Sequence, residues 1–80
     1  ELLENEFETI NLNEFLNLND EFRANIKIRY RSSKIKGTIK KLENGGTKVI
    51  LDEKISGIAS GQLAVFYDDL DRVLASGFIK

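Results

Sequence analysis

The chain has 80 residues, of which 41% are hydrophobic and 31% charged, and it contains no cysteine and no histidine. A chain of this length buries only about 60–65% of its unfolded surface, so we expect one small domain, residues 1–80, that folds without disulfides. The missing Cys and His exclude the usual nucleophile–base pairs and zinc sites. We therefore expect no catalytic residue and no metal ligand here, although carboxylate or lysine chemistry is not excluded.

The net charge of −1 conceals a strong segregation of charge along the chain. Residues 1–22 carry seven acids and no base, residues 23–48 carry nine bases and one acid, and residues 49–80 carry five acids and three bases. Local potential rather than net charge governs the encounter with a polyanion. The central third is therefore the candidate binding region.

No segment of the sequence predicts a membrane span or a secretion signal. The longest uncharged run, residues 55–67, is shorter than the roughly 20 apolar residues that cross a bilayer, and no signal-peptide pattern opens the chain. We expect a cytoplasmic protein without a membrane partner. Because residue 1 is Glu rather than Met, we also expect the chain to be a piece of a longer, multidomain protein.

Residues 1–22 form an acidic lead-in with a mixed pattern. Phe7, Ile10 and Leu12 predict a short opening strand. A turn of helix or a loop is expected next, because apolar residues with i, i+3, i+4 spacing follow a capping Asn11: Leu12, Phe15 and Leu16.

Residues 23–31 predict a half-buried strand with one basic face, and residues 23–80 are expected to form the core of the domain. The apolar face alternates with the basic one. The apolar positions are Ala24, Ile26, Ile28 and Tyr30. The polar positions are Arg23, Asn25, Lys27, Arg29 and Arg31.

Residues 34–60 continue with a predicted hairpin. Ile35, Gly37 and Ile39 alternate with lysines, and Leu42 then falls out of phase, which predicts a β-bulge near residues 40–41. Residues 43–46 (Glu-Asn-Gly-Gly) supply the turn, and residues 47–51 the returning strand. Residues 52–60 are expected to form a loop or an irregular strand.

Residues 63–67 and 73–79 predict a second hairpin across an acidic turn. That turn is typical of a solvated hairpin rather than a calcium loop, because it lacks the twelve-residue calcium pattern. Phe66 and Tyr67 are expected in the core or against a neighbouring domain. Six short, closely spaced strands favour an all-β fold, a closed six-stranded antiparallel barrel that resembles the second domain of elongation factors.

An ordered set of motifs resembles a known family. Lys-Ile-Arg-Tyr-Arg at residues 27–31 is followed by Asp52-Glu53, then by Gly-Gln-x-Ala-Val-Phe-Tyr-Asp at residues 61–68 and Val-Leu-x-x-Gly-x-Ile at residues 73–79. This order is similar to that of the carboxy-terminal domain of the bacterial tRNA-specific 2-thiouridylases, formerly labelled tRNA (5-methylaminomethyl-2-thiouridylate) methyltransferases. The resemblance covers roughly residues 23–80 and is weaker before them.

The resemblance implies a tRNA-binding accessory barrel without catalysis of its own. In that family an amino-terminal ATP-pyrophosphatase domain and a small central domain precede the barrel, and the enzyme adenylates the wobble uridine and replaces its C2 oxygen with sulfur. The expected partners are tRNA and those two domains. No cofactor is expected in this chain, because ATP would bind in the absent catalytic domain.

The predicted RNA-binding residues combine the resemblance with the basic strand. In the family the Arg29-Tyr30 motif contacts tRNA, and a guanidinium and an aromatic ring suit a phosphate and an unpaired base. Other cations would neutralise phosphates around this pair. These cations are Lys27, Arg31, Lys34, Lys36 and Lys40. Gln62 is a further candidate because the family uses the equivalent Gln near tRNA.

Each candidate also has a structural interpretation. Tyr30 suits the core as well as a base contact, and Gln62 suits a turn-stabilising hydrogen bond. The lysines could form an ordinary solvated face, although one acid among nine bases argues against it. The rival function is a structural or protein-interaction barrel that binds no RNA and holds neighbouring domains in register.

Overall fold

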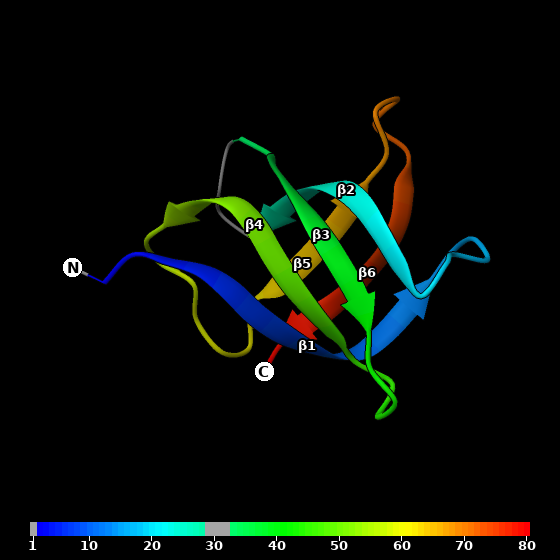
Figure 1. The fold of residues 1–80 in the computed structure, drawn as a ribbon, viewed down its shortest axis with the longest axis horizontal. Helices are drawn as coiled ribbons and strands as arrows, with labels where there is room; N and C mark the ends of the chain where they lie inside the picture. The colour runs from blue at the N-terminus through cyan, green and yellow to red at the C-terminus, as the bar shows by residue number, and fades with distance from the viewer. Residues whose placement is uncertain (1, 29–32) are drawn as a thin grey trace.

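Six antiparallel strands close into a barrel in the computed structural model, which describes residues 2–28 and 33–80. The strands are β1 (Glu4–Glu14), β2 (Glu21–Ile28), β3 (Ile35–Lys41), β4 (Thr47–Ile55), β5 (Leu63–Tyr67) and β6 (Val73–Ile79). Their order around the barrel is β1-β4-β3-β2-β5-β6, and the pairing of β6 with β1 closes it (Figure 1). The predicted closed six-stranded antiparallel barrel is confirmed.

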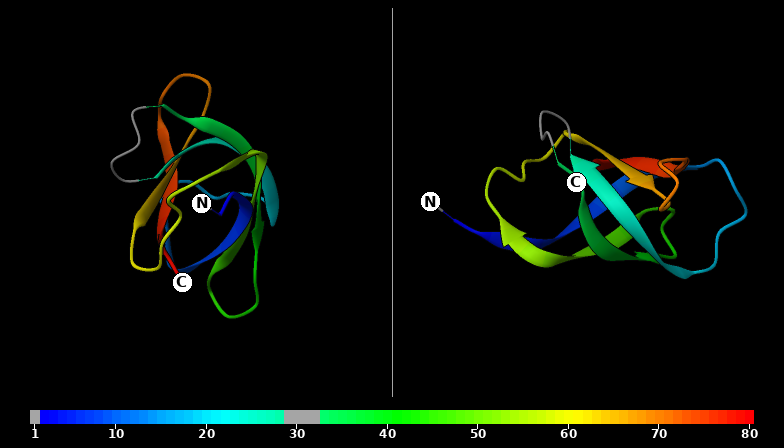
Figure 2. Two further views of the ribbon diagram at one scale, coloured as in Figure 1. Left: turned by 90° about the vertical axis from the view of Figure 1, so that its left-hand side faces the viewer. Right: turned by 90° about the horizontal axis from the view of Figure 1, so that it is seen from above.

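The views in Figure 2 show the strands wrapped around one interior, with the connecting loops projecting at the ends. Among the described residues, no helix has the length and apolarity needed to cross a membrane. The core is formed by inward-facing side chains of all six strands. Its buried apolar residues are Phe7, Ala24, Ile26, Ile28, Ile39, Val49, Leu51, Ala64, Phe66, Leu74, Ala75 and Ile79.

The alternation of residues 23–28 predicted the inner face of β2 correctly. Ala24, Ile26 and Ile28 are buried, while Arg23 is exposed. The bounds of β5 and β6 also agree with the predicted hairpin at residues 63–67 and 73–79. In these three strands the apolar pattern has period two over at least part of its length, which is the signature of a strand with one buried face.

Of the two alternatives predicted after the opening strand, the helical turn was wrong, and the loop is confirmed at residues 15–20. β1 continues to Glu14, and its register with β6 shifts between Ile10 and Asn13, where Asn11 has a φ of 56°. A bulge at Asn11 moves Leu12 to the core side, while Ile10 stays on the outer face and is 42% exposed. The inner position before the bulge belongs to Thr9, which the apolar pattern did not select.

The predicted bulge in β3 was wrong, whereas the prediction for the end of β4 is confirmed in one of its two forms. The register of β3 with β4 is continuous from Gly37 to Lys41, so there is no bulge at residues 40–41. Leu42 falls out of phase because the strand has ended and the turn begins, with the Leu42 N–H donating to the Gly46 carbonyl at 2.9 Å. β4 extends to Ile55, which pairs with Glu4 after a register shift, so residues 52–55 form the irregular strand that was one of the two predicted alternatives.

Candidate nucleic-acid interface

Three lysines gather at one end of the β2–β3 pair. The antiparallel register places Asn25 opposite Lys36 and Ile26 opposite Ile35, so the next positions along the two chains are Lys27 and Lys34. Lys27 and Lys36 alternate with buried neighbours and therefore lie on the outer face. We call Lys27, Lys34 and Lys36 the lysine cluster.

Lys40 does not join this cluster. It is four residues from Lys36 along β3, which corresponds to about 13 Å at roughly 3.3 Å per residue. Its register partners on the neighbouring strands are Glu21 of β2 and Lys48 of β4. The expectation that Lys40 lies near the same RNA contact as Lys34 and Lys36 is therefore corrected. The lysines of β3 alternate along its whole length, so they reach both ends of the barrel.

Two further lysines of the central segment are held by acids of β1. The Lys41 ammonium lies 2.7 Å from the Glu14 carboxylate and donates to the Leu18 carbonyl at 2.6 Å. This ammonium holds the pKa of Glu14 below its ordinary value. Lys48 lies 3.3 Å from Glu6. Part of the acidic lead-in therefore neutralises the end of the barrel opposite the lysine cluster.

Arg23 is also engaged, by Asp52 of β4. The guanidinium donates to both carboxylate oxygens, at 2.7 Å from Nη1 and 2.5 Å from Nη2, and Nη1 donates to the Thr38 hydroxyl at 3.1 Å. The hydrogen bonds from Arg23 lower the pKa of Asp52, and the pKa of Arg23 is raised in turn. Arg23 thus fastens β2 to β4 across β3, and its charge is largely used there.

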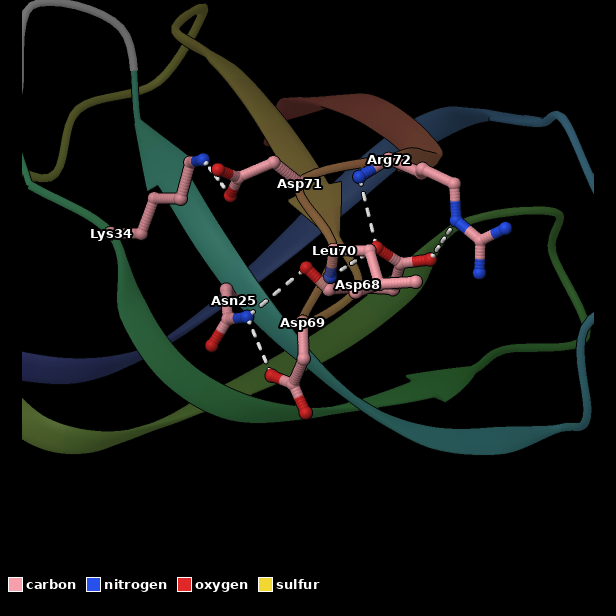
Figure 3. Close-up of polar contacts among 7 residues, drawn as sticks. All are labelled: Asn25, Lys34, Asp68, Asp69, Leu70, Asp71 and Arg72. Atoms are coloured by element: carbon pink, nitrogen blue, oxygen red, sulfur yellow. Dashed lines mark hydrogen bonds and ion pairs between the residues drawn. The ribbon is translucent and has the colours of Figure 1, made fainter.

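The hairpin between β5 and β6 is joined to Asn25 of β2 and to Lys34 of the cluster by a network of hydrogen bonds (Figure 3). Asn25 donates to the Asp69 carboxylate at 3.0 Å and to the Asp68 carbonyl at 3.3 Å. The Lys34 ammonium lies 2.6 Å from the Asp71 carboxylate and 4.1 Å from the centre of the Tyr67 ring. These contacts fix the hairpin against β2 and the start of β3.

Asp68 holds the turn itself. Its carboxylate accepts hydrogen bonds from the backbone N–H groups of Arg72 and Leu70, at 2.9 and 2.8 Å, and from Arg72 Nε at 2.7 Å. These donors, the Arg72 N–H first, lower the pKa of Asp68. The acidic turn is therefore built as a hairpin, in agreement with its interpretation as a solvated turn.

A hollow of about 280 Å³ lies between the hairpin and the outer face of β2 and β3. One cross-strand row on its floor consists of Lys36, Asn25 and Tyr67, which are partners in the register. The remaining lining residues are Arg23, Ala24, Asp68 and Asp69. The hollow thus offers a cation, an amide and an aromatic ring side by side.

Tyr67 was not among the predicted RNA-binding residues. Ala64 and Phe66 point into the core, so the alternation of β5 turns Tyr67 outward, next to Asn25. Alternation along residues 63–67, with Phe66 taken as an inward-facing residue, could have shown that Tyr67 faces outward. The apolar character of the whole segment hid this alternation.

Gln62 stabilises a turn. Its side-chain oxygen accepts a hydrogen bond from the Ala59 N–H at 2.9 Å, and its own N–H donates to the Ala59 carbonyl at 3.3 Å. Since Ala64 pairs with Ile28, Gln62 lies at the same end of the barrel as Lys27. The structural interpretation of Gln62 is supported, while an RNA contact through its amide stays a prediction.

Arg29, Tyr30 and Arg31 lie outside the described residues, so the RNA contacts expected of them stay predictions. In the sequence they follow directly after Ile28, the last residue of β2.

Comparisons with known proteins agree with the fold. A family model described as the aminomethyltransferase β-barrel domain matches residues 5–79. A tRNA-specific 2-thiouridylase MnmA from Campylobacter fetus is 54% identical over 74 residues, covering 92% of this chain and 21% of its own length. Proteins with the same name from Campylobacter jejuni and Campylobacter hominis are 44% and 40% identical and are covered over 23% and 29% of their lengths. The chain thus spans between a fifth and a third of these relatives.

Proposed function

The chain belongs to the aminomethyltransferase β-barrel domain family, and on this premise we propose that it is the tRNA-docking barrel of a longer tRNA-uridine 2-sulfurtransferase. The names of its relatives support this assignment. The ATP-dependent thiolation of the wobble uridine belongs to other domains, since residues 1–80 contain neither cysteine nor a Ser-Gly-Gly-x-Asp-Ser nucleotide loop. The partners of the barrel are tRNA and those domains, and its compartment is the cytoplasm.

The lysine cluster is the observation that carries the proposal. Lys27 and Lys36 lie on the outer face at one end of the β2–β3 pair, with Lys34, which is paired with Asp71, beside them. Cations gathered in this way suit the phosphates of one RNA segment, and such contacts set affinity and register. Tyr67 lies beside the cluster with the Lys34 ammonium over its ring, so an unpaired base that stacks on this face takes the place of that ammonium. Arg29, Tyr30 and Arg31 would add to this surface.

The decisive experiment reverses charge within the cluster in the full-length enzyme. Lys27→Glu combined with Lys36→Glu should raise the KM for tRNA by about tenfold or more and leave kcat nearly unchanged, because phosphate contacts made equally in the bound and transition states affect binding alone. Lys80→Glu is the matched control, because Lys80 lies beside Glu8 on β1, away from the cluster. Its KM should stay close to that of the unmodified enzyme.

Salt dependence gives an independent measure. Two phosphate contacts, from Lys27 and Lys36, predict a slope of about −1.4 for log affinity against log salt on single-stranded RNA, and the double variant should flatten it. A KM unaffected by the double variant, together with salt-insensitive binding, would instead favour the barrel as a scaffold that binds no RNA.

A further inference from the structure

The outer surface of β5 and β6 lacks the charges that a solvated strand normally carries. Residues 63–67 and 73–79 contain no charged side chain at all. An antiparallel strand with one face in water usually alternates apolar inner residues with polar outer ones. These two strands keep an apolar outer face as well.

Large apolar side chains line up across this surface in one row. The register pairs Ile10 of β1 with Phe78 of β6, and Phe78 with Leu63 of β5. Phe78 is 48% exposed and Ile10 is 42% exposed, while Leu63 is half-buried. We call Ile10, Phe78 and Leu63 the apolar row.

The surface beside the row is also uncharged. Val65 of β5 pairs with Ser76 of β6 one step along the barrel, and Val73, farther along β6, is 40% exposed. Isolated exposed apolar residues are common, but a contiguous group on neighbouring strands marks an interaction surface.

The β6 and β1 part of this surface lies far around the barrel from the lysine cluster, while its β5 part borders β2. In the closed order of six strands, β6 is three strands away from β3 in either direction, and β1 is three strands away from β2. A partner seated on Ile10 and Phe78 therefore leaves Lys36 of β3 accessible, whereas Lys27 lies at the edge of the apolar surface, opposite Val65. Because the row itself carries no cation, it is not suited to a phosphate chain.

We propose that the apolar row packs against another domain of the same polypeptide, so that the barrel is held through β6 and β1 and the outer face of β3, with Lys36, stays open. This rests on the proposed function, in which the barrel is one domain of a longer enzyme. The relatives place most of their length outside the matched segment, which is 21% and 23% of two of them. A tethered domain acts at an effective concentration of about millimolar, which exceeds that of a second copy of the chain in solution.

Hydroxyl-radical footprinting read by mass spectrometry tests this directly. The oxidation rate of Phe78 is measured in the 80-residue chain and in the full-length enzyme. It should fall by roughly fivefold or more in the enzyme, because a packed interface excludes water as a protein interior does. Leu70, 73% exposed at the tip of the β5–β6 hairpin, is the internal reference and should react equally in both. Equal rates for Phe78 in the two samples would overturn the proposal.

Two matched variants give a second readout in the full-length enzyme. Phe78→Asp should release the barrel, so that limited proteolysis between the domains accelerates and small-angle scattering shows a larger radius of gyration. Leu70→Asp should change neither. Unchanged proteolysis and scattering with Phe78→Asp would contradict the proposal.

The outcomes separate this proposal from the RNA proposal and from a dimer. Protection of Phe78 in the 80-residue chain that rises with concentration, with dimers in sedimentation, would assign the row to a second copy and overturn the proposal. If the Lys27 and Lys36 variants leave tRNA binding unchanged while Phe78 is protected in the enzyme, the RNA proposal fails and the domain interface stands. If tRNA binding is lost while Phe78 reacts freely in the enzyme, only the interface fails.

Discussion

At the scale of single residues, the core contains one polar pair that satisfies itself. The hydroxyl oxygens of Thr9 and Thr47 lie 2.5 Å apart, and the two residues are 2% and 0% exposed. They are partners in the β1–β4 register, so each provides the hydrogen bond that the other cannot obtain from water. The pair fixes the register of the strand that closes the barrel.

The two single substitutions in this pair should together lower the free energy of unfolding by more than the double substitution does. Thr9→Val should destabilise the fold by about 1–3 kcal/mol, because the remaining buried hydroxyl loses its partner. The double variant Thr9→Val/Thr47→Val should be less destabilised than the sum of the two single variants. Urea unfolding of the four proteins measures this difference, and strict additivity would contradict it.

Asp68 should make the stability of the fold depend on pH in the acid range. Its pKa is lowered in the folded state by hydrogen bonds from the Arg72 and Leu70 N–H groups and the Arg72 side chain. The stabilisation is therefore present above the unfolded value of about 3.9 and is lost as the pH falls through the lower, folded pKa.

Unfolding measurements between about pH 2 and pH 7 test this. Asp68→Ala should lower the stability at neutral pH and reduce its loss in acid. An acid dependence identical to that of the unmodified chain would show that other carboxylates, such as Asp52 and Glu14, account for the effect, because their pKa values are lowered as well.

At the scale of elements, the turn between β3 and β4 needs its two glycines for different reasons. Gly45 has a φ of +88° with open space around its Cα. A Cβ on Gly46 would lie 2.0 Å from the Thr9 carbonyl oxygen, a backbone atom of β1. Gly46 therefore lets the turn approach β1 closely, whereas Gly45 only needs a left-handed backbone.

Gly46→Ala should consequently destabilise the barrel more than Gly45→Ala. At residue 45 the strain of a left-handed alanine costs about 1–2 kcal/mol. At residue 46, which has no positive φ, the added Cβ meets a backbone atom of β1 that must shift, and such overpacking costs about 1–3 kcal/mol or more. Thermal unfolding of the two variants gives the order. An equal loss in both would mean that β1 adapts without cost.

The structure and the sequence pattern give different predictions for a substitution of Lys40 on β3. A uniform basic strip predicts equal effects for Lys36→Glu and Lys40→Glu, since both side chains lie on the outer face of one strand. The structure predicts a clear rise in the KM for tRNA with Lys36→Glu and a small one with Lys40→Glu, because Lys40 lies beyond the cluster, near Glu21 and Lys48. Equal effects would contradict this.

The alternation of apolar and polar side chains was enough to predict most of the strands. The charges that stay available at the candidate site depend instead on contacts between segments far apart in the sequence. Period two in residues 23–28 fixed which face of β2 is buried, and it placed Lys27 on the outer face. No local pattern showed that Asp52 would engage Arg23 or that Asp71 would reach Lys34, since those partners are 29 and 37 residues apart in sequence. The bulge at Asn11 likewise depends on the pairing of β1 with β6.

At the scale of the whole molecule, closure joins strands from the two ends of the sequence. Thr9 pairs with Ile79, and the Lys80 N–H donates to the Glu8 carbonyl at 2.8 Å. Barrels with such non-local pairing fold slowly, because the entropy of a long loop is lost before these contacts form.

Refolding of the 80-residue chain should therefore take milliseconds to seconds, as in other small all-β domains. The chain contains no proline, so the phase of tens of seconds that prolyl isomerisation produces should be absent. Stopped-flow dilution from urea followed by the fluorescence of the two tyrosines measures both expectations. A dominant phase slower than about ten seconds would contradict them.

The β1–β6 seam also determines how the barrel responds to mechanical load. The two strands are antiparallel, and the start of β1 and the end of β6 lie at the same end of the pair. Tension that draws residue 2 away from residue 80 first separates residues 4–8 from β4 and then loads the β1–β6 hydrogen bonds one after another from Thr9 onward, rather than all together in shear. The barrel is therefore a soft link under force, and it unravels from this seam before neighbours whose strands must slide past one another.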